Sequence, residues 1–421
     1  MRIALLSYRS KTHCGGQGVY VRYLSRGLAD LGHQVEVFSG QPYPEQLDPR
    51  VRLTEVPSLD LYRDDDPFRT PHPREFRDRT DLLEVATMWT AGFPEPRTFS
   101  TRVAKLLRSR TADFDVVHDN QCLGYGLLDI ARHLPVVATI HHPITRDRAV
   151  DLAAAPWRRI PFVHRWYGFL GMQRRVARRI PDLLTVSSSS AADIVADFGV
   201  APEQLHTVPL GVDTELFRPR GQSRVPGRIV AVASADKPLK GIAHLLEAVA
   251  RLRHTREVEL RLVGRLEPNG PTEKLIAELG LADIVTATSG LSDQELAELL
   301  ASAQVACIPS IYEGFSLPAV EAMASGTPLV ASRAGALPEV VGDCAELVEP
   351  GNVDQLTRAL DELLGDPRRL DRMGRAGRGR AVAIFSWPAV GARTALVYER
   401  AIERHRAGPT TAVAAHGVSP R

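Results

Sequence analysis

The chain has 421 residues, more than a single hydrophobic core usually organises, and we expect two domains. Its 52 basic and 50 acidic residues nearly cancel, so the overall charge does not indicate a nucleic-acid partner. The four cysteines form no Cys-x-x-Cys pair, which argues against a zinc site or a disulfide framework and favours a reducing, cytoplasmic location.

Short apolar runs rich in β-branched residues recur through the first half of the chain, with stretches of helical spacing between them. They occupy 2–8, 34–40, 114–119, 135–142 and 182–189. Such alternation is typical of a parallel sheet whose strands are buried on both faces. The first run is too short for a signal peptide, and no run of about 18 apolar residues occurs, so we expect neither export nor a membrane-spanning helix.

A glycine-rich loop follows the first predicted strand, within 8–21. Gly16 and Gly18, together with Glu36 twenty residues beyond Gly16, resemble part of a dinucleotide-binding fingerprint. Val21 stands in the place of the third glycine, however, and the loop is long. The pattern therefore does not favour NAD binding.

Two segments depart from the alternation of strands and helices. The first, 41–100, is rich in proline, arginine and aspartate, and we expect a long excursion from the sheet. Its acidic run 64–66 has no partner ligands nearby and is expected to be a solvated turn rather than a metal site.

The second segment, 157–182, holds seven arginines, several aromatic residues and no acidic residue before Asp182. A basic amphipathic helix over 157–180 could rest on an anionic membrane surface, which would place the protein at the inner face of the membrane. Alternatively, one face of the helix packs on its own domain and the arginines stay in water. The sequence leaves both interpretations open.

A stretch of glycine, proline and arginine at 211–228 interrupts the pattern and predicts a linker. Strand-like runs then resume at 228–235, 259–265, 304–310 and 328–334. We therefore predict an α/β chain with two doubly wound, Rossmann-like domains at 1–215 and 216–387. A helix at 388–406 is expected to pack back on the first domain, and 407–421 to form a flexible tail.

Glu313 and Glu321 flank a Gly-Phe-Ser-Leu-Pro loop, with Pro318 in the first turn of a predicted helix that also carries Glu321. The amides of 314–317 then lie at the positive end of that helix, which suits a phosphate group. Each carboxylate can accept hydrogen bonds from vicinal hydroxyls. A nucleotide-sugar, with hydroxyls on both sides of a diphosphate, satisfies all of these groups.

Two other interpretations of this carboxylate pair remain. Glycoside hydrolases hold two carboxyl groups about 5–9.5 Å apart, whereas eight helical residues span about 12 Å, so the spacing favours binding over hydrolysis. Both glutamates could also be solvated residues around an ordinary helix start.

Residues 313–328 read Glu-Gly-Phe-Ser-Leu-Pro-Ala-Val-Glu-Ala-Met-Ala-Ser-Gly-Thr-Pro. This run resembles the signature of the family-4 retaining glycosyltransferases of the GT-B architecture, and the resemblance continues through 185–219, 289–310, 335–343 and 385–387. It implies two domains facing a cleft and transfer of a sugar from a nucleotide-sugar to an acceptor hydroxyl with retention of configuration. It also implies no cofactor and no obligatory metal, and a glycan, lipid-linked or small-molecule acceptor.

The resemblance also implies roles for individual residues. Glu321 would hold the ribose, while Glu313 and the loop after it would contact the sugar and the diphosphate; that loop comprises Gly314, Phe315, Ser316 and Leu317. Lys240 would stabilise the departing nucleotide, and His141, at the end of a predicted strand, would contact the donor sugar. Gly16, in a loop that faces the cleft in this family, would let the backbone approach the donor phosphate or the acceptor closely. His118 and Asp119, also at a strand end, are candidates for the acceptor side.

The chain departs from the family pattern at one place. The family usually has an arginine six residues before the lysine, where this chain has Ser234, and Lys237 or Arg265 could supply the missing charge. Ser234 leaves open a binding protein that keeps the nucleotide-sugar site but has lost transfer. A nucleotide-sugar epimerase, which uses the same architecture, is a second alternative, and the glutamate loop argues against it.

Overall fold

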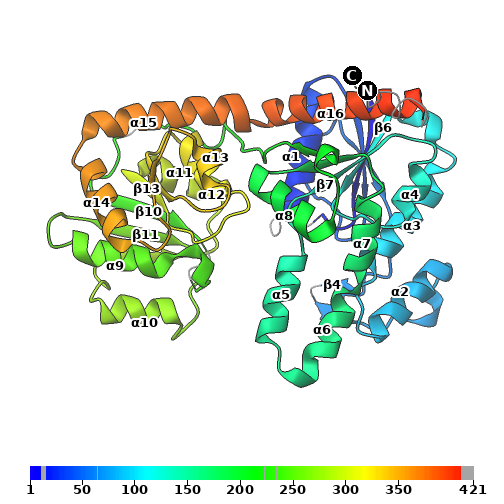
Figure 1. The fold of residues 1–421 in the computed structure, drawn as a ribbon, viewed down its shortest axis with the longest axis horizontal. Coiled ribbons are helices and arrows are strands. Elements are labelled where there is room, and N and C mark those ends of the chain that lie inside the picture. Colours follow the sequence, from blue (N-terminus) through cyan, green and yellow to red (C-terminus); the bar gives the residue numbers. More distant parts are fainter. Residues whose placement is uncertain (11–15, 64, 222, 234–235, 409–421) are drawn as a thin grey trace, which may run out of the picture. The chain divides into compact units, whose positions relative to one another are not determined.

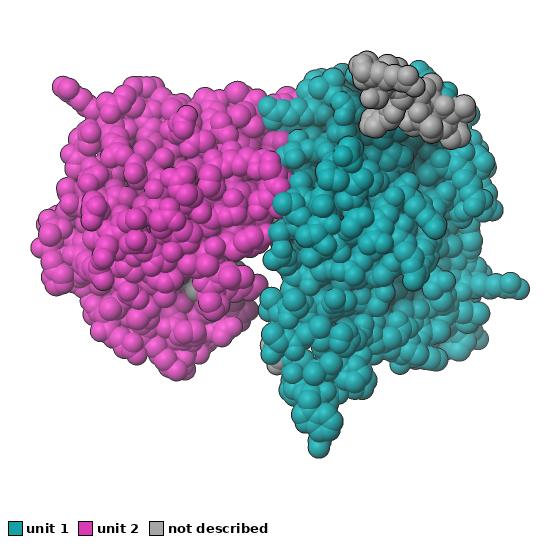
Figure 2. All heavy atoms as spheres, viewed as in Figure 1, with its two compact units in different colours: residues 1–186, 190–208, 390–421 teal, residues 187–189, 209–389 magenta. Residues whose placement is uncertain are grey.

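The computed structural model of the protein describes residues 1–10, 16–63, 65–221, 223–233 and 236–408. Asp64 of the acidic run, Ser234 and most of the predicted tail lie outside the described residues. The chain divides into two compact units (Figure 2). The first comprises 1–186, 190–208 and the residues from 390 onward, and the second comprises 187–189 and 209–389.

The first unit is built on a seven-stranded sheet with the order β3-β2-β1-β6-β7-β8-β9. Its pairs are all parallel within the described residues. The strands are β1 Arg2–Ser7, β2 Gln34–Ser39, β3 Arg52–Glu55, β6 Val116–Asn120, β7 Val136–Ile140, β8 Asp182–Thr185 and β9 Leu205–Thr207. Because the adjacent strands β1, β6 and β7 are parallel, the loops that follow them lie at the same edge of the sheet.

Helices cover both faces of this sheet (Figure 1). One face, with Ala4 and Leu6 of β1, forms a core with α3, α4, α7 and α8. The other face, with His118, is contacted by Tyr20 of α1 and Tyr398 of α16. The helices are α1 Gly16–Asp30, α3 Glu95–Leu107, α4 Gly126–Ile130, α7 Leu170–Ala177, α8 Ser188–Phe198 and α16 Trp387–Ala407, which belongs to the first unit from Val390 onward.

The predicted excursion forms a small substructure of its own. It consists of β4 Tyr62–Arg63, β5 Asp66–Pro67 and α2 Arg79–Trp89. Together with α5 Thr145–Ala154 and α6 Ile160–Trp166, it lies at the end of the first unit opposite the chain's N-terminus (Figure 1). Its apolar centre is an aromatic cluster in which Tyr62, Phe93 and Trp166 contact one another with ring centroids 5.2–5.7 Å apart.

The single helix expected over 157–180 is instead four short segments. These are 3₁₀ turns at Trp157–Arg159 and Tyr167–Phe169, and the helices α6 and α7. Pro161, in the first turn of α6, and Gly168, in the 3₁₀ turn before α7, stand where helical continuity is broken. Because α7 buries Leu170 and Val176 in the domain core, the second half packs on its own domain. Among the described residues, no helix combines the length and apolar character that crossing a membrane requires.

The second unit is a six-stranded parallel sheet with the order β12-β11-β10-β13-β14-β15. Its strands are β10 Arg228–Val232, β11 Glu259–Val263, β12 Val285–Thr288, β13 Val305–Ile308, β14 Leu329–Ser332 and β15 Glu346–Val348. Its helices are α9 Ile242–Leu252, α10 Pro271–Glu278, α11 Asp293–Ser302, α12 Leu317–Ala324, α13 Leu337–Val341, α14 Val353–Leu364 and α15 Pro367–Arg380.

The core of the second unit follows the alternation of strand residues. Ile229 and Ala231 of β10 face a cluster built by α9 and α14. The helices α11 and α12 lie on the other side of the sheet (Figure 1). Both units are therefore doubly wound parallel α/β folds, which confirms the predicted fold class.

Candidate functional site

The carboxylate pair predicted from the sequence lies on the loop between β13 and α12, which carries Glu313, and on α12 itself, which carries Glu321. Ser316 ends the loop and caps α12, because its hydroxyl accepts a hydrogen bond from the Ala319 amide at 3.4 Å. The helix begins at Leu317, so Glu321 lies just beyond its first turn and not within it. The early amides of α12 have no partner inside the helix and carry the positive end of its dipole.

Glu313 is held by an ion pair. Its Oε1 accepts hydrogen bonds from the Lys240 ammonium at 2.7 Å and from the Ser310 hydroxyl at 2.8 Å. The side chains of Glu313 and Lys240 are 12% and 32% exposed, so the pair is screened less than one on the open surface. The Glu313 carboxylate is therefore held in place by a cation and a hydroxyl at the end of the loop.

Two glycines bring neighbouring loops against the glutamate loop. Gly241 has φ +66°, and a Cβ there would lie 2.0 Å from the Pro309 carbonyl oxygen. Gly335 has φ +53°, and its Cβ would lie 2.1 Å from the Glu313 carbonyl oxygen. Only glycine tolerates both the left-handed backbone and the close approach. The loops after β10, β13 and β14 are therefore packed together at the carboxyl edge of adjacent strands.

The surroundings of Glu321 change the pKa of its carboxyl group. Burial, with a smaller contribution from Asp293, raises the pKa of Glu321 to about 7. Among the described residues, its carboxylate has no hydrogen-bond partner. A half-buried acceptor without a partner suits a ligand that donates hydrogen bonds, such as a diol.

Three other residues predicted to bind the donor differ in exposure and in their contacts. Phe315 is 8% exposed and packs against Phe385 with ring centroids 5.9 Å apart, so its side chain belongs to the interior of the second unit. Lys237 and Arg265 are exposed and form no ion pair with a described residue. Their loops are joined by Asp236, whose carboxylate accepts hydrogen bonds from the amides of residues 267 and 272.

In the first unit, His141 follows β7 and is held by the end of β6. Its Nε2 lies 2.7 Å from Asn120 Oδ1, and its backbone amide donates to Gln121 Oε1 at 2.9 Å. The Tyr20 ring contacts the imidazole edge-on, with centroids 4.7 Å apart. Burial lowers the pKa of His141 to about 3, so the ring is neutral. Gly16 begins α1, next to Gln17, whose carbonyl accepts a hydrogen bond from Asn120.

Comparisons with known proteins bear on both units. Residues 14–216 match the model of "Glycosyltransferase Family 4", and residues 213–380 match that of "Glycosyl transferases group 1". The chain is 71% identical over 408 residues to an "MMP alpha-(1->4)-mannosyltransferase" of Mycolicibacterium hassiacum, covering 96% of this chain and 99% of that protein. The chain belongs to the family-4 glycosyltransferases.

More distant members of the family agree. A "D-inositol 3-phosphate glycosyltransferase 1" of Catenulispora acidiphila is 30% identical over 431 residues, covering 94% of this chain and 93% of that protein. The solved structure of sucrose-phosphate synthase from Thermosynechococcus elongatus superposes with a TM-score of 0.67 at 23% identity, covering 95% and 98% of the two chains. At that identity the likeness shows the GT-B fold alone. The family and the GT-B fold of this glycosyltransferase therefore agree with the prediction from the motif.

The structure corrects one expectation about the acceptor side of this glycosyltransferase. His118 is fully buried, and its ring nitrogens lie 2.6 Å from the Tyr398 hydroxyl and 2.6 Å from the Thr139 hydroxyl. Asp119 is also fully buried and accepts a hydrogen bond from the Leu123 amide. These successive side chains point to opposite faces of the sheet and are enclosed there, so neither can contact an acceptor.

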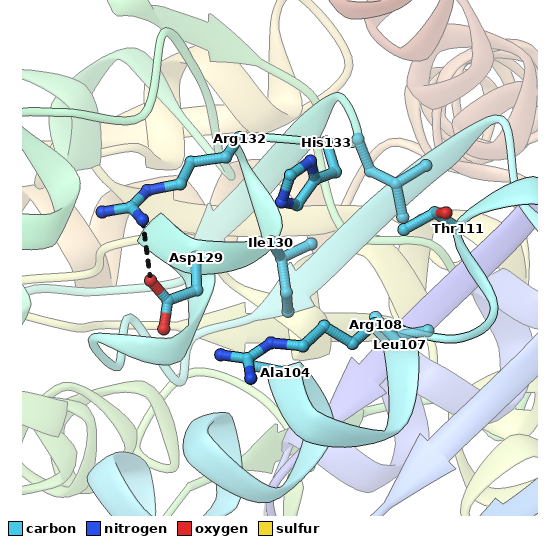
Figure 3. A pocket seen from close by; sticks show the side chains of 9 residues that line it. Ala104, Leu107, Arg108, Thr111, Asp129, Ile130, Arg132 and His133 are labelled. Atoms are coloured by element: carbon cyan, nitrogen blue, oxygen red, sulfur yellow. Dashed lines mark ion pairs between the residues drawn. The ribbon is translucent and has the colours of Figure 1, made fainter.

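A hollow of about 60 Å³ lies elsewhere in the first unit, between α3 and α4. Arg108, Arg132 and His133 surround it, and Arg132 pairs with Asp129 at 3.9 Å (Figure 3). Its residues precede β6 and β7, so it lies at the amino ends of the strands. Parallel α/β sheets bind ligands at the opposite edge, and this hollow is not part of the candidate site.

Several residues that shape the site were not predicted from the sequence: Ser310, Gly335, Asn120 and Gln121. Gly335 lies in a run that matched the family, and Asn120 ends a predicted strand. These two positions were the sequence signals that could have pointed to Gly335 and Asn120. The partners they hold, however, are distant in the sequence and became visible only in the fold.

Proposed function

We propose that this glycosyltransferase moves a mannosyl residue from a nucleotide-sugar to a hydroxyl of a glycan acceptor, forming an α-(1→4) bond with retention of configuration. The 71% identical relative supports the sugar and the linkage through its name. The ion pair between Lys240 and Glu313 beside the start of α12 carries the proposal structurally, because it sets a cation and a hydroxyl-binding carboxylate next to an anion-binding helix end.

The donor residues have separate tasks in this proposal. The amides of Gly314, Ser316 and Leu317 and the Lys240 ammonium bind the diphosphate. Glu321 accepts hydrogen bonds from the two ribose hydroxyls, and Glu313 binds the sugar. Phe315 contributes its backbone amide. Lys237 and Arg265 are candidates for the second cation that the family usually places at the position of Ser234.

The chemistry needs no protein nucleophile. As the bond between the sugar and the diphosphate breaks, negative charge grows on the leaving phosphate oxygen, and Lys240 and the helix amides stabilise it. That oxygen accepts the proton of the acceptor hydroxyl as the new glycosidic bond forms on the same face of the sugar. An α-linked donor then gives an α-linked product. The same groups meet the electrostatic need that a divalent cation serves in other transferases, so we propose no obligatory metal.

A thermal-shift panel tests the donor, because a ligand that binds only the folded protein raises its melting temperature. UDP-, GDP- and ADP-mannose, and the matching glucose donors, are compared at equal concentration. We expect one nucleotide-mannose to stabilise the protein most. That donor, incubated with an α-linked mannoside, should yield free nucleotide and a longer mannoside.

The same incubation separates the alternatives. An epimerase would change the donor sugar without an acceptor, and a binding protein would give stabilisation without nucleotide release. The comparisons favour neither. Donor binding without any product of transfer would contradict the proposed activity.

Contact with a membrane stays a prediction. The tip between α5 and α6 favours it, because Trp157 and Phe162 are 75% and 61% exposed beside the exposed Arg158 and Arg159. Sedimentation with anionic vesicles tests it: Trp157→Ala should reduce binding, and equal recovery with neutral vesicles would contradict a charge-dependent contact.

A further inference from the structure

The side chain of Asn120 has only one orientation that satisfies its contacts. Its Nδ2 donates a hydrogen bond to the Gln17 carbonyl oxygen at 3.3 Å. A carbonyl can only accept, so the amide nitrogen must face Gln17 and the amide oxygen must face His141. Oδ1 lies 2.7 Å from His141 Nε2 in this orientation.

This orientation determines the tautomer of His141. Because Oδ1 can only accept, Nε2 must carry the proton. The ring is neutral, since burial lowers the pKa of His141 to about 3, so its other nitrogen, Nδ1, keeps a free lone pair. Within the described part of the chain, Nδ1 has no hydrogen-bond partner. It is also not a fully buried atom. The half-buried ring therefore presents an acceptor.

The backbone around His141 is held just as closely. The Gln121 side chain accepts from the His141 amide at 2.9 Å and donates to the His142 carbonyl at 3.2 Å. Gln121 adopts φ +58°, a left-handed conformation that is unfavourable for a residue with a side chain. Gln173 secures this turn, because its Nε2 donates to the carbonyls of Gln121 and Cys122 at 3.3 and 3.1 Å.

We propose that Asn120 is a positioning residue: it keeps the proton of His141 on Nε2, so that Nδ1 accepts a hydrogen bond from a hydroxyl of the transferred sugar. The tautomer rests on contacts within the first unit alone. The part concerning the sugar rests on the proposed function. Gln121 supports the same arrangement by holding the backbone of His141 in place.

Nitrogen NMR of the full-length protein tests the tautomer directly. With ¹⁵N-labelled histidine and His141→Asn for assignment, wild-type His141 should show a protonated Nε2 and an unprotonated Nδ1 at neutral pH. Asn120→Ala removes the acceptor, and both tautomers should then be present. Asn120→Asp keeps an acceptor oxygen and should preserve the Nε2–H form. The signals of His142, whose ring contacts Asp147, serve as an internal reference.

Kinetics test the part that concerns the sugar. Asn120→Ala should lower kcat/KM for the nucleotide-mannose about five- to tenfold, the effect of one hydrogen bond, while the Kd of the free nucleotide stays unchanged. Gln294→Ala, which removes an exposed amide on α11, is the matched control and should leave kcat/KM unaltered.

The proposal is overturned if Asn120→Ala retains the pure Nε2–H tautomer, or if it transfers mannose as efficiently as wild type. A wild-type protein that is inactive with every nucleotide-mannose would overturn the proposed function and the sugar contact with it. The NMR result would still decide whether Asn120 sets the tautomer.

Discussion

At the scale of single residues, the candidate site depends on ionisable groups whose hydrogen bonding is incompletely satisfied. Lys240 and Glu313 pair with each other while both keep some exposure, and Glu321 has no partner within the described residues. A binding site for a polyhydroxylated anion needs this combination, because the ligand must find free donors and acceptors without leaving buried charges unpaired.

Lys240→Ala tests whether the ammonium acts mainly on the departing nucleotide. We expect kcat to fall by about tenfold or more, with a smaller change in donor Kd, because the charge that Lys240 stabilises grows in the transition state. Steady-state kinetics and calorimetry measure the two quantities. Lys274→Ala removes an exposed lysine on α10 and should change neither. Equal losses in kcat and affinity would indicate uniform binding instead.

Glu321→Gln should separate stability from binding. Because burial raises the pKa of Glu321 to about 7, the folded protein favours the protonated form more than the unfolded chain, whose glutamates titrate near pH 4.3. The stability that this group contributes is complete below about pH 4 and is lost as the pH rises through 7. The variant should therefore melt above wild type at pH 8, with a smaller difference at pH 5.

The same variant should bind nucleotide more than about tenfold more weakly, because the proposed function assigns the Glu321 carboxylate two charge-assisted bonds to the ribose. Scanning calorimetry gives the melting temperatures and titration calorimetry gives the affinity. Glu298→Gln, an exposed carboxylate on α11, is the control for both measurements. Unchanged nucleotide affinity would refute the ribose assignment, and a lower melting temperature at pH 8 would refute the effect of burial.

At the scale of elements, the site is an assembly of loops at the ends of adjacent strands. β10, β13 and β14 are neighbours in the sheet, and each is followed by a loop that contributes to the site. The Ala336 amide donates to the Glu313 carbonyl at 2.8 Å, and the Ile311 amide donates to the Leu239 carbonyl at 2.8 Å. Backbone contacts between loops thus place the side chains.

Gly335→Ala should disturb this assembly. Its Cβ would lie 2.1 Å from the Glu313 carbonyl, so the loop must shift, and we expect lower donor affinity together with reduced stability. Gly280→Ala is a matched control, because Gly280 is also left-handed, at φ +64°, but has no atom within 4 Å of an added Cβ. Calorimetric affinity for the donor should fall only in the first variant. A similar affinity for both would show that the close approach does not matter.

At the scale of the molecule, the last described helix completes the first unit. From Val390 onward α16 belongs to that unit, and its Tyr398 is fully buried against His118 on the central strand β6. Residues near both ends of the chain therefore contribute to one core. The stability of the N-terminal sheet depends on the C-terminal helix.

Tyr398→Phe should reduce the free energy of unfolding by about 1–3 kcal/mol, because it leaves a buried His118 nitrogen without its partner. Urea titration followed by circular dichroism measures the change. Tyr125→Phe, whose hydroxyl bonds the exposed Arg175, should have a much smaller effect. Equal changes in the two variants would mean that the buried contact contributes no more than a surface one.

Much of this fold was predictable because its signals are local. The buried central strands of both units appear as continuous apolar runs, and the motif at 313–328 marks the family. The short strands β3, β9, β12 and β15 gave no such run, because they are partly exposed and contain polar residues, as in Leu-His-Thr of β9. The prediction of one continuous helix over 157–180 was wrong. It gave more weight to the apolar spacing of this stretch than to the proline and glycines within it.

The sequence by itself determined the doubly wound architecture and the family motif at 313–328, because both depend on residues close together in the chain. Only the tertiary structure decided which groups act on one another. Lys240 reaches Glu313 across 73 positions, and Asn120 reaches His141 across 21. Parallel strands bring distant loops to the same edge, so hydrogen bonding and charge at that edge depend on strand order rather than on sequence spacing.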